Sequence, residues 1–366
     1  GIDVDSGENL RRARFGAGGT LFTDWSYEFI YDFGGSGSET TGISSAFIQY
    51  NGLGPVHLRV GAYAPPESFE DATSASDLLF LERAQPTDVA RGIGGADGRD
   101  AATVFAYDAN YFAALSYTGG MTGQTGIFDE QQALVGRFAY RFVKTDDANL
   151  AVGADSTYVF KLPDIAPGTS ALNTFTLGER PELNVDDNNI KLVSTGGLFA
   201  TKVWQWGVEA TGNWRSLYAQ GGYYGFQVDR RTGFDNASFD GWYAQASWVI
   251  TGEAKEYRAD RGAYTIPKPN EPFNLDKAGI GAWELAARYS VLNFNDNAGS
   301  AGLPTPPGGV RGGEQKIWTA GVNWYPNTAV RFMLDYQHTN VDRLDALGGS
   351  LSARLDAVSL RSQVSF

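Results

Sequence analysis

The sequence predicts a transmembrane antiparallel β-barrel that occupies residues 1–366 as a single domain. Three observations support this fold class. Segments of about ten residues alternate between apolar and polar side chains, most of these segments begin or end on an aromatic residue, and turn-forming residues separate them. A chain of 366 residues is long for a single domain, but barrels of this length are common.

The first clear segment runs from residue 25 to residue 33. One of its faces carries only aromatic residues: Trp25, Tyr27, Phe29, Tyr31 and Phe33. The opposite face carries Ser26, Glu28 and Asp32. Because a period of two places successive side chains on opposite faces of a sheet, this pattern predicts a strand. The same alternation returns in later segments: 204–214, 242–251, 283–290, 318–324 and 330–337.

The composition and the closing segment agree with a barrel. Aromatic residues make up 13% of the chain and charged residues 19%. No run of 18 or more apolar residues occurs, which excludes a transmembrane helix, whereas a barrel needs only every second residue to face lipid. Residues 355–366 form an amphipathic segment whose apolar face ends on Phe366, as is typical of bacterial outer-membrane barrels.

The links between segments predict the two ends of the barrel. Short links such as 325–328 alternate with longer polar links such as 295–313. This alternation is typical of tight periplasmic turns and long outer loops.

Several functions are excluded by what the chain lacks. It has no cysteine, which removes thiolate chemistry and cysteine-based metal sites, and its net charge of −13 argues against a nucleic-acid partner. His57 and His338 have no nucleophile signature beside them, so we expect no enzyme activity. Residues 186–189 are polar but fit no defined calcium loop, so we expect no metal and no cofactor.

Four stretches give the chain a resemblance to a known family. The first is Leu10–Gly16 with Trp25–Asp32, and the second runs from Val60 to Arg83. The third is Gly241 through Glu253 with Gly281–Leu285 and Arg288–Tyr289, and the fourth is Gly321–Tyr325 with the closing segment. In this order they resemble the phosphate-selective porins O and P over nearly the whole chain. The resemblance implies a homotrimer of 16-stranded barrels in the bacterial outer membrane, each with an inward-folded loop that narrows the pore. Family chains begin with one more strand before the arginine pair, so we expect the first strand to be missing here and about 15 strands to be visible.

The resemblance also implies which residues line the pore. Arg11 and Arg12 match the family's paired arginines on the periplasmic side of an arginine ladder, and Arg180 before Pro181 matches another rung. Arg14, which follows the pair, is a further candidate for the lumen. Ser44 stands where the family has a constriction aspartate. Ser74 is what remains of a serine pair, and Asp71 stands at a lysine position. The constriction loop itself is acidic, and its carboxylates are Glu67, Glu70, Asp71, Asp77 and Glu82.

Three functions therefore stay open at this stage. The first is a passive diffusion channel for small hydrophilic solutes, with anions such as phosphate preferred because arginines line the lumen. The second is a weakly selective or cation- or sugar-permeable porin, since an aspartate in place of a lysine opposes anions. The third is a structural barrel of the cell envelope. In each case we expect outer-membrane lipid and lipopolysaccharide around the wall.

Overall fold

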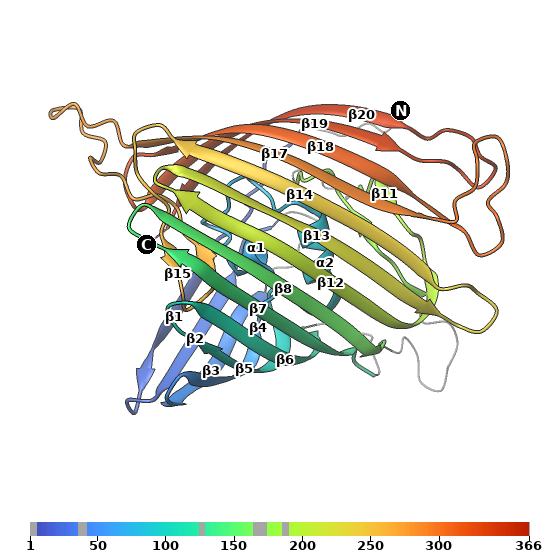
Figure 1. Ribbon diagram of the computed structural model, residues 1–366, viewed down its shortest axis with the longest axis horizontal. Helices are drawn as coiled ribbons and strands as arrows, with labels where there is room; N and C mark the ends of the chain where they lie inside the picture. The colour runs from blue at the N-terminus through green and yellow to red at the C-terminus, as the bar shows by residue number, and fades with distance from the viewer. Residues whose placement is uncertain (1–5, 36–41, 124–128, 164–173, 185–189, 366) are drawn as a thin grey trace.

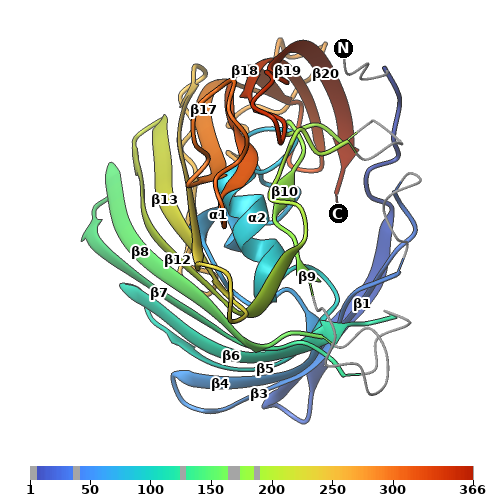
Figure 2. The same ribbon diagram turned by 90° about the vertical axis from the view of Figure 1, so that its right-hand side faces the viewer.

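The computed structural model describes residues 6–35, 42–123, 129–163, 174–184 and 190–365. One antiparallel sheet curves into a barrel, and two short helices lie inside it (Figures 1 and 2). The sheet has sixteen strands. Fifteen follow one another in chain order, and the short strand β9 pairs with the start of β12. The prediction of a transmembrane antiparallel barrel is confirmed.

The elements have the following bounds. The wall strands are β1 (Arg14–Leu21), β2 (Trp25–Asp32), β3 (Gly42–Leu53), β4 (Val56–Tyr63), β5 (Arg99–Tyr107), β6 (Tyr111–Met121), β7 (Gln132–Lys144), β8 (Ala148–Lys161), β12 (Leu198–Trp214), β13 (Leu217–Arg230), β14 (Ala237–Val249), β17 (Ala282–Asp296), β18 (Val310–Tyr325), β19 (Val330–Asp342) and β20 (Ala353–Val364). The short strands are β9 (Thr174–Phe175), β10 (Gly178–Glu179), β11 (Val193–Ser194), β15 (Tyr257–Arg258) and β16 (Ala263–Tyr264). The helices are α1 (Phe69–Ala72) and α2 (Gln85–Gly94).

The sheet has two edges, β1 and β20. Among the described residues these two strands do not pair with each other, and Figure 2 shows them on either side of an opening in the wall. The expectation of a further strand before Arg11 stays a prediction. Phe366, on which the predicted closing segment ends, lies outside the described residues.

The alternation read from the sequence places side chains on the two faces of the wall. In β14, Trp242 and Trp248 are exposed on the outer face, whereas Tyr243 between them is 2% exposed and points inward. The neighbouring tyrosines of β13 also separate, because Tyr223 is exposed and Tyr224 is fully buried. Outward aromatic residues suit the lipid interfaces, and inward ones pack against the material that fills the barrel.

Short connections lie at one end of the barrel and long connections at the other, with one exception. Short turns such as 54–55, 145–147 and 215–216 lie at one end, and long connections such as 64–98, 297–309 and 343–352 lie at the other. The exception is segment 250–281, which joins β14 to β17 at the short-turn end. The prediction that all periplasmic links are tight is therefore wrong for this segment. No described helix is both long enough and apolar enough to cross a membrane.

Candidate functional site

The loop between β4 and β5, residues 64–98, enters the barrel and carries α1 and α2 (Figure 2). Ser68 caps α1, because its Oγ accepts a hydrogen bond of 3.1 Å from the amide of Asp71. Pro86 lies in the first turn of α2, where a missing amide hydrogen costs nothing. Local sequence signals thus define the helices that narrow the lumen.

Carboxylates of the wall fix this loop in place. Glu209 of β12 accepts a hydrogen bond of 2.6 Å from the amide of Phe69, and Asp335 of β19 accepts one of 3.0 Å from the amide of Leu81. The loop amides at these points have no partner in regular secondary structure, so the wall supplies their acceptors. The loop therefore lies against strands that are far from it in the sequence.

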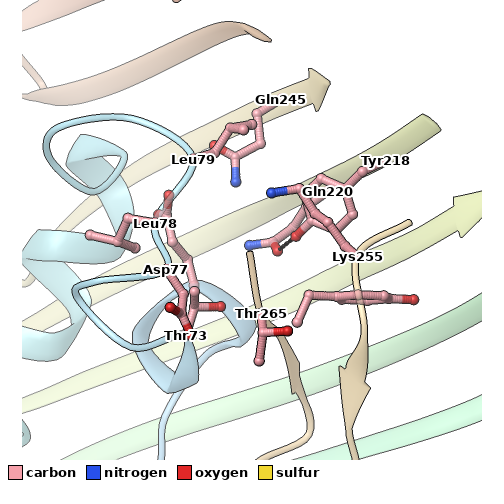
Figure 3. A pocket seen from close by; sticks show the side chains of 11 residues that line it. Thr73, Asp77, Leu78, Leu79, Tyr218, Gln220, Gln245, Lys255 and Thr265 are labelled. Carbon is pink, nitrogen blue, oxygen red and sulfur yellow. Dashed lines mark hydrogen bonds between the residues drawn. The ribbon is translucent and has the colours of Figure 1, made fainter. Parts of the chain in front are cut away.

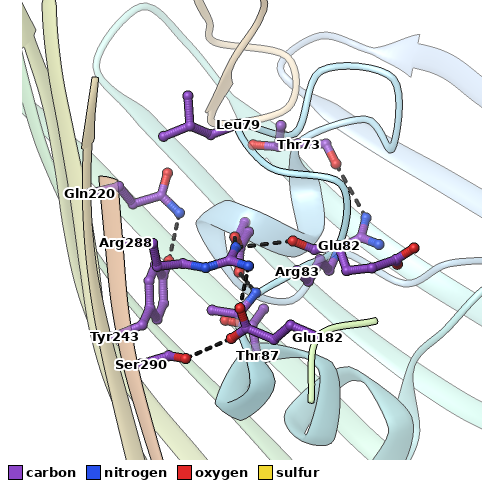
Figure 4. A network of polar contacts seen from close by, with 12 residues as sticks. Thr73, Leu79, Glu82, Arg83, Thr87, Glu182, Gln220, Tyr243, Arg288 and Ser290 are labelled. Carbon is purple, nitrogen blue, oxygen red and sulfur yellow. Dashed lines mark hydrogen bonds and ion pairs between the residues drawn. The ribbon is translucent and has the colours of Figure 1, made fainter. Parts of the chain in front are cut away.

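A second polar network joins the loop, the wall and segment 162–197 (Figure 4). Glu182 accepts hydrogen bonds from the amide of Gln85 at 2.9 Å and from the hydroxyl of Ser290 at 2.6 Å. Its other oxygen pairs with Arg288 of β17, which also lies 3.6 Å from Glu70. All of these groups are buried, so the network fixes the start of α2 against the wall.

Glycines in the wall make room for the loop. A Cβ atom at Gly153 of β8 would lie 2.9 Å from the ring of Phe69, and one at Gly241 of β14 would lie 2.9 Å from Pro86. Both distances are shorter than normal van der Waals contact. The positions where α1 and the start of α2 touch the wall therefore exclude side chains.

Arginines surround the carboxylates of the loop on the side that faces β1 and β20. Glu82 accepts two hydrogen bonds from Arg11, at 2.9 and 3.1 Å, and lies 3.3 Å from Arg361 of β20. Asp71 lies 2.6 Å from Arg91 and 3.9 Å from Arg83. Each of these two carboxylates is therefore shared between two guanidinium groups.

A third carboxylate shared between two arginines, Asp97, lies at the end of the loop. Asp97 lies 3.0 Å from Arg91 and also pairs with Arg14, which in turn pairs with Asp32 at 2.7 Å. Arg12 lies beside Arg11, but its guanidinium has no hydrogen bond or ion pair among the described residues. We use the name arginine cluster for the six arginines gathered here: Arg11, Arg12, Arg14, Arg83, Arg91 and Arg361.

The mutual proximity of these charges shifts their pKa values. Burial alone would raise the pKa of Glu82, but Arg11, and then Arg361 and Arg12, lower it to about 2. Burial opposes ionisation of Asp97 as well, and Arg91 and Arg14 hold its pKa well below the usual range. Burial and the charge of Arg11 lower the pKa of Arg12 to about 9, so Arg12 stays cationic at neutral pH. The cluster thus keeps its full set of charges near pH 7.

The structure places the predicted arginines beside the constriction loop. Arg14 begins β1 at the end opposite the turn 22–24, and Arg11 touches the loop through Glu82. The periplasmic position that the resemblance implied for these arginines is therefore wrong. Arg180 lies in segment 162–197, where its side chain contacts Asn184 and its carbonyl accepts from Gln315 at 3.0 Å.

The two predicted serines and the acidic loop have different surroundings. Ser44 lies 3.5 Å from Asp97, so a carboxylate from the loop lies beside the position where the family has an aspartate. Ser74 bonds to Ser76 at 2.9 Å within the loop. Glu67 is fully buried and accepts from Thr157 of the wall at 3.0 Å.

Asp77 has no ion pair among the described residues and lines a small cavity (Figure 3). Segment 250–281 forms the other side of this cavity, with Lys255 and Thr265. Lys255 is itself buried and lies 2.9 Å from Glu284 of β17. Two inward segments thus meet in the lumen, one from each end of the barrel.

Sequence reasoning missed four members of the site: Arg83, Arg91, Asp97 and Arg361. For Arg361 a signal was present, since it alternates with the outward residues Leu360 and Ser362 of the last strand. No group of three or more histidine, aspartate or glutamate side chains that could hold a metal ion occurs in the described part of the chain. The polar residues 186–189 lie outside that part.

The fold and the site define an outer-membrane porin, a barrel channel whose lumen is narrowed by an inward loop. The family model for the phosphate-selective porin O and P matches residues 1–366, and the chain belongs to this family. Porin O of Pseudomonas aeruginosa is 26% identical over 92% of this chain and 77% of its own length. These matches place the protein in the bacterial outer membrane and identify it as a channel rather than an enzyme.

Solved structures give the same fold. The anion-selective porin from Comamonas acidovorans aligns with a TM-score of 0.53 at 11% identity, over 98% of this chain and 88% of that protein. OprB of Pseudomonas putida aligns with a TM-score of 0.54 at 8% identity, over 93% of this chain and 83% of that protein. At such low identity the likeness concerns the barrel alone.

Proposed function

We propose that this porin prefers small anions, inorganic phosphate among them, and that the arginine cluster provides the preference. One observation carries the proposal: Asp71, Glu82 and Asp97 are each shared between two arginines, while Arg12 forms no hydrogen bond or ion pair with any described residue. These three carboxylates are therefore compensated, and the cluster retains excess positive charge.

The chemistry follows from the geometry of guanidinium groups. A guanidinium offers a planar set of donors that matches the oxygens of phosphate and replaces part of its hydration shell. The carboxylates that share the arginines hold these side chains in position and reduce the net attraction. Conduction requires such moderate binding, because a solute that binds too strongly does not leave.

The test is a reversal potential in a planar bilayer under a KCl gradient. We expect anion preference in the unmodified protein and a reduced preference in Arg12→Gln. The control Arg215→Gln removes a charge from the turn between β12 and β13, where the Arg215 side chain is 65% exposed. Phosphate added to the chloride solution should reduce the chloride current of the unmodified protein.

A clear cation preference of the unmodified protein would refute the proposal and favour the weakly selective, cation- or sugar-permeable alternative. An electrically silent protein that is correctly inserted would favour the structural barrel. If Arg12→Gln lowers the anion preference no more than Arg215→Gln does, the arginine cluster does not provide the preference.

We further infer that three copies assemble in the membrane, with lipid and lipopolysaccharide around the rest of the wall. One barrel of the same fold, OmpT of Vibrio cholerae, is described in a trimer form. The outer face of β20 also supports assembly, since Val358, Leu360 and Val364 are more than two-thirds exposed in the single chain. The mass of the detergent-solubilised protein, measured by light scattering, tests the trimer.

A further inference from the structure

A second cavity lies at the long-loop end of the barrel, away from the constriction. It has a volume of about 390 Å³, within the range of sites that bind small molecules. Its walls come from the segment before β12 and from three connections: β13 to β14, β17 to β18 and β19 to β20. A solute that approaches the pore from this side meets the cavity before the arginine cluster.

Three arginines line the cavity, and they differ in how many hydrogen bonds their guanidinium groups make with the protein. Arg311 donates to four backbone carbonyls, those of residues 298, 300, 303 and 345, so it holds the loops together. Arg230 donates to the carbonyl of Gly308 at 2.9 Å and lies over the ring of Phe234. Arg343 makes no side-chain hydrogen bond or ion pair with any described residue. Its Nε is buried, which makes an unmet donor costly.

The remaining surface of the cavity is largely apolar. Leu198, Leu344 and Leu351 line it, together with Phe199 and Phe234, whose ring centroids are 5.5 Å apart. Inorganic phosphate would gain nothing from these side chains, whereas an apolar group would lose water-exposed surface against them.

One carboxylate also lines the cavity, that of Asp345. Its Oδ1 accepts hydrogen bonds of 2.8 Å from the amides of Leu347 and Gly349, which keeps it ionised. A single negative charge beside two cations that are not fully engaged favours a monoanion over a dianion. The site therefore fits an anion of charge −1 with an apolar body.

We propose that this cavity binds small monocarboxylates that carry an aromatic or branched apolar group. The carboxylate pairs with the guanidinium of Arg343, and the apolar body lies against the leucine and phenylalanine side chains. The site concentrates such acids at the outer mouth of the pore. It does not depend on the ion preference of the constriction.

The test measures the affinity of the purified porin in detergent for benzoate, acetate and inorganic phosphate by isothermal titration calorimetry. We expect benzoate to bind at least about tenfold more tightly than acetate, since only benzoate covers the apolar wall. Phosphate should not compete with benzoate at equal concentration. Arg343→Gln should weaken benzoate about tenfold or more, as expected for the loss of a charge-assisted hydrogen bond.

Two further variants keep the test decisive. Arg354→Gln removes the same charge from an exposed position of β20 outside the cavity and should leave benzoate affinity unchanged. Leu351→Asn alters only the apolar wall at a side chain that is 51% exposed, so it should weaken benzoate but not acetate. Equal affinities for benzoate and acetate, or equal effects of Arg343→Gln and Arg354→Gln, would overturn the proposal.

Discussion

Removing the charge of Glu82 should increase the anion preference of the pore. Glu82→Gln keeps the shape of the side chain but leaves Arg11 and Arg361 without their shared carboxylate. For an ion that passes about 6 Å from one uncompensated charge, Coulomb's law in water gives about 0.7 kcal/mol, and screening at ~0.1 M salt reduces this to about 0.4 kcal/mol. Anions gain this energy and cations lose it, so the ratio of anion to cation permeability should rise about fourfold.

The pH dependence makes this prediction specific to Glu82. Its pKa is lowered to about 2 by the arginines, so the carboxylate stays ionised from pH 7 down to pH 4. The difference between Glu82→Gln and the unmodified protein should therefore persist over this whole range. If Glu82 had the pKa of an ordinary glutamate, its carboxyl would be mostly protonated near pH 4, and the difference between Glu82→Gln and the unmodified protein would largely disappear there.

The lowered pKa of Glu82 also predicts an effect on the free energy of unfolding. A pKa lowered from 4.5 to about 2 corresponds to about 3 kcal/mol of favourable interaction of the carboxylate with its neighbours. Because the pKa of the folded state is the lower one, this contribution is present above pH 4.5 and is lost as the pH falls toward 2. Urea unfolding in lipid vesicles at pH 7 should show the loss in Glu82→Gln.

The assay is the reversal potential under a KCl gradient at pH 7 and pH 4, with Glu67→Gln as the matched control. Burial, and then Asp71 and Asp155, raise the pKa of Glu67 well above its usual range. At pH 4 this carboxyl is therefore protonated, and an amide in its place should leave the field in the lumen unchanged at that pH. A shift of Glu82→Gln toward cations, or a difference that disappears at pH 4, would refute the reasoning.

Three further predictions concern how the inward segments are held. Lys255→Met should destabilise the barrel by about 3–5 kcal/mol in urea unfolding, because Glu284 would be left buried and unpaired. The double variant with Glu284→Gln should recover much of this loss, and a cost below about 1 kcal/mol in the single variant would contradict the prediction. Gly153→Ala should lower single-channel conductance, since its Cβ would push the ring of Phe69 into the lumen, and an unchanged conductance would show that the loop yields elsewhere. Glu182→Gln should increase open-channel current noise by freeing the start of α2, whereas noise equal to that of the unmodified protein would mean that Gln85 and Ser290 hold the loop without it.

The wall of the barrel was predictable because alternation is a local property. Trp242 and Trp248 face outward, and Tyr243 faces inward, as a period of two requires. Alternation alone does not say what the aromatic residues of β13 contact, because an interfacial aromatic and one that packs against an inward loop have the same spacing. Tyr224 and Phe226 proved to be fully buried inside the barrel.

The arrangement of the site was not predictable because it depends on the path of the loops. Asp71 suggested repulsion of anions when read as a single residue. Its two arginine partners, Arg83 and Arg91, lie 12 and 20 residues further along the chain and reach it only after the loop has folded back. The position of segment 250–281 inside the barrel also depends on partners that are distant in the sequence. Lys255 pairs with Glu284 of β17, and Arg137 of β7 donates to the carbonyls of Arg261 and Gly262.

The shared carboxylate of Glu82 has a consequence for how the barrel is assembled. Its partners Arg11 and Arg361 are 71 and 279 residues away in the chain; Arg11 lies just before the edge strand β1, and Arg361 lies in the other edge strand, β20. This contact can form only when the loop is already inside and both edges have come together. Insertion of the loop and the approach of the two edges are thereby linked, and the slow search for such distant partners places this step late in folding. Without the loop, Arg11 and Arg361 would face each other with no anion between them, so the position of the loop and the approach of the two edges depend on the same carboxylate.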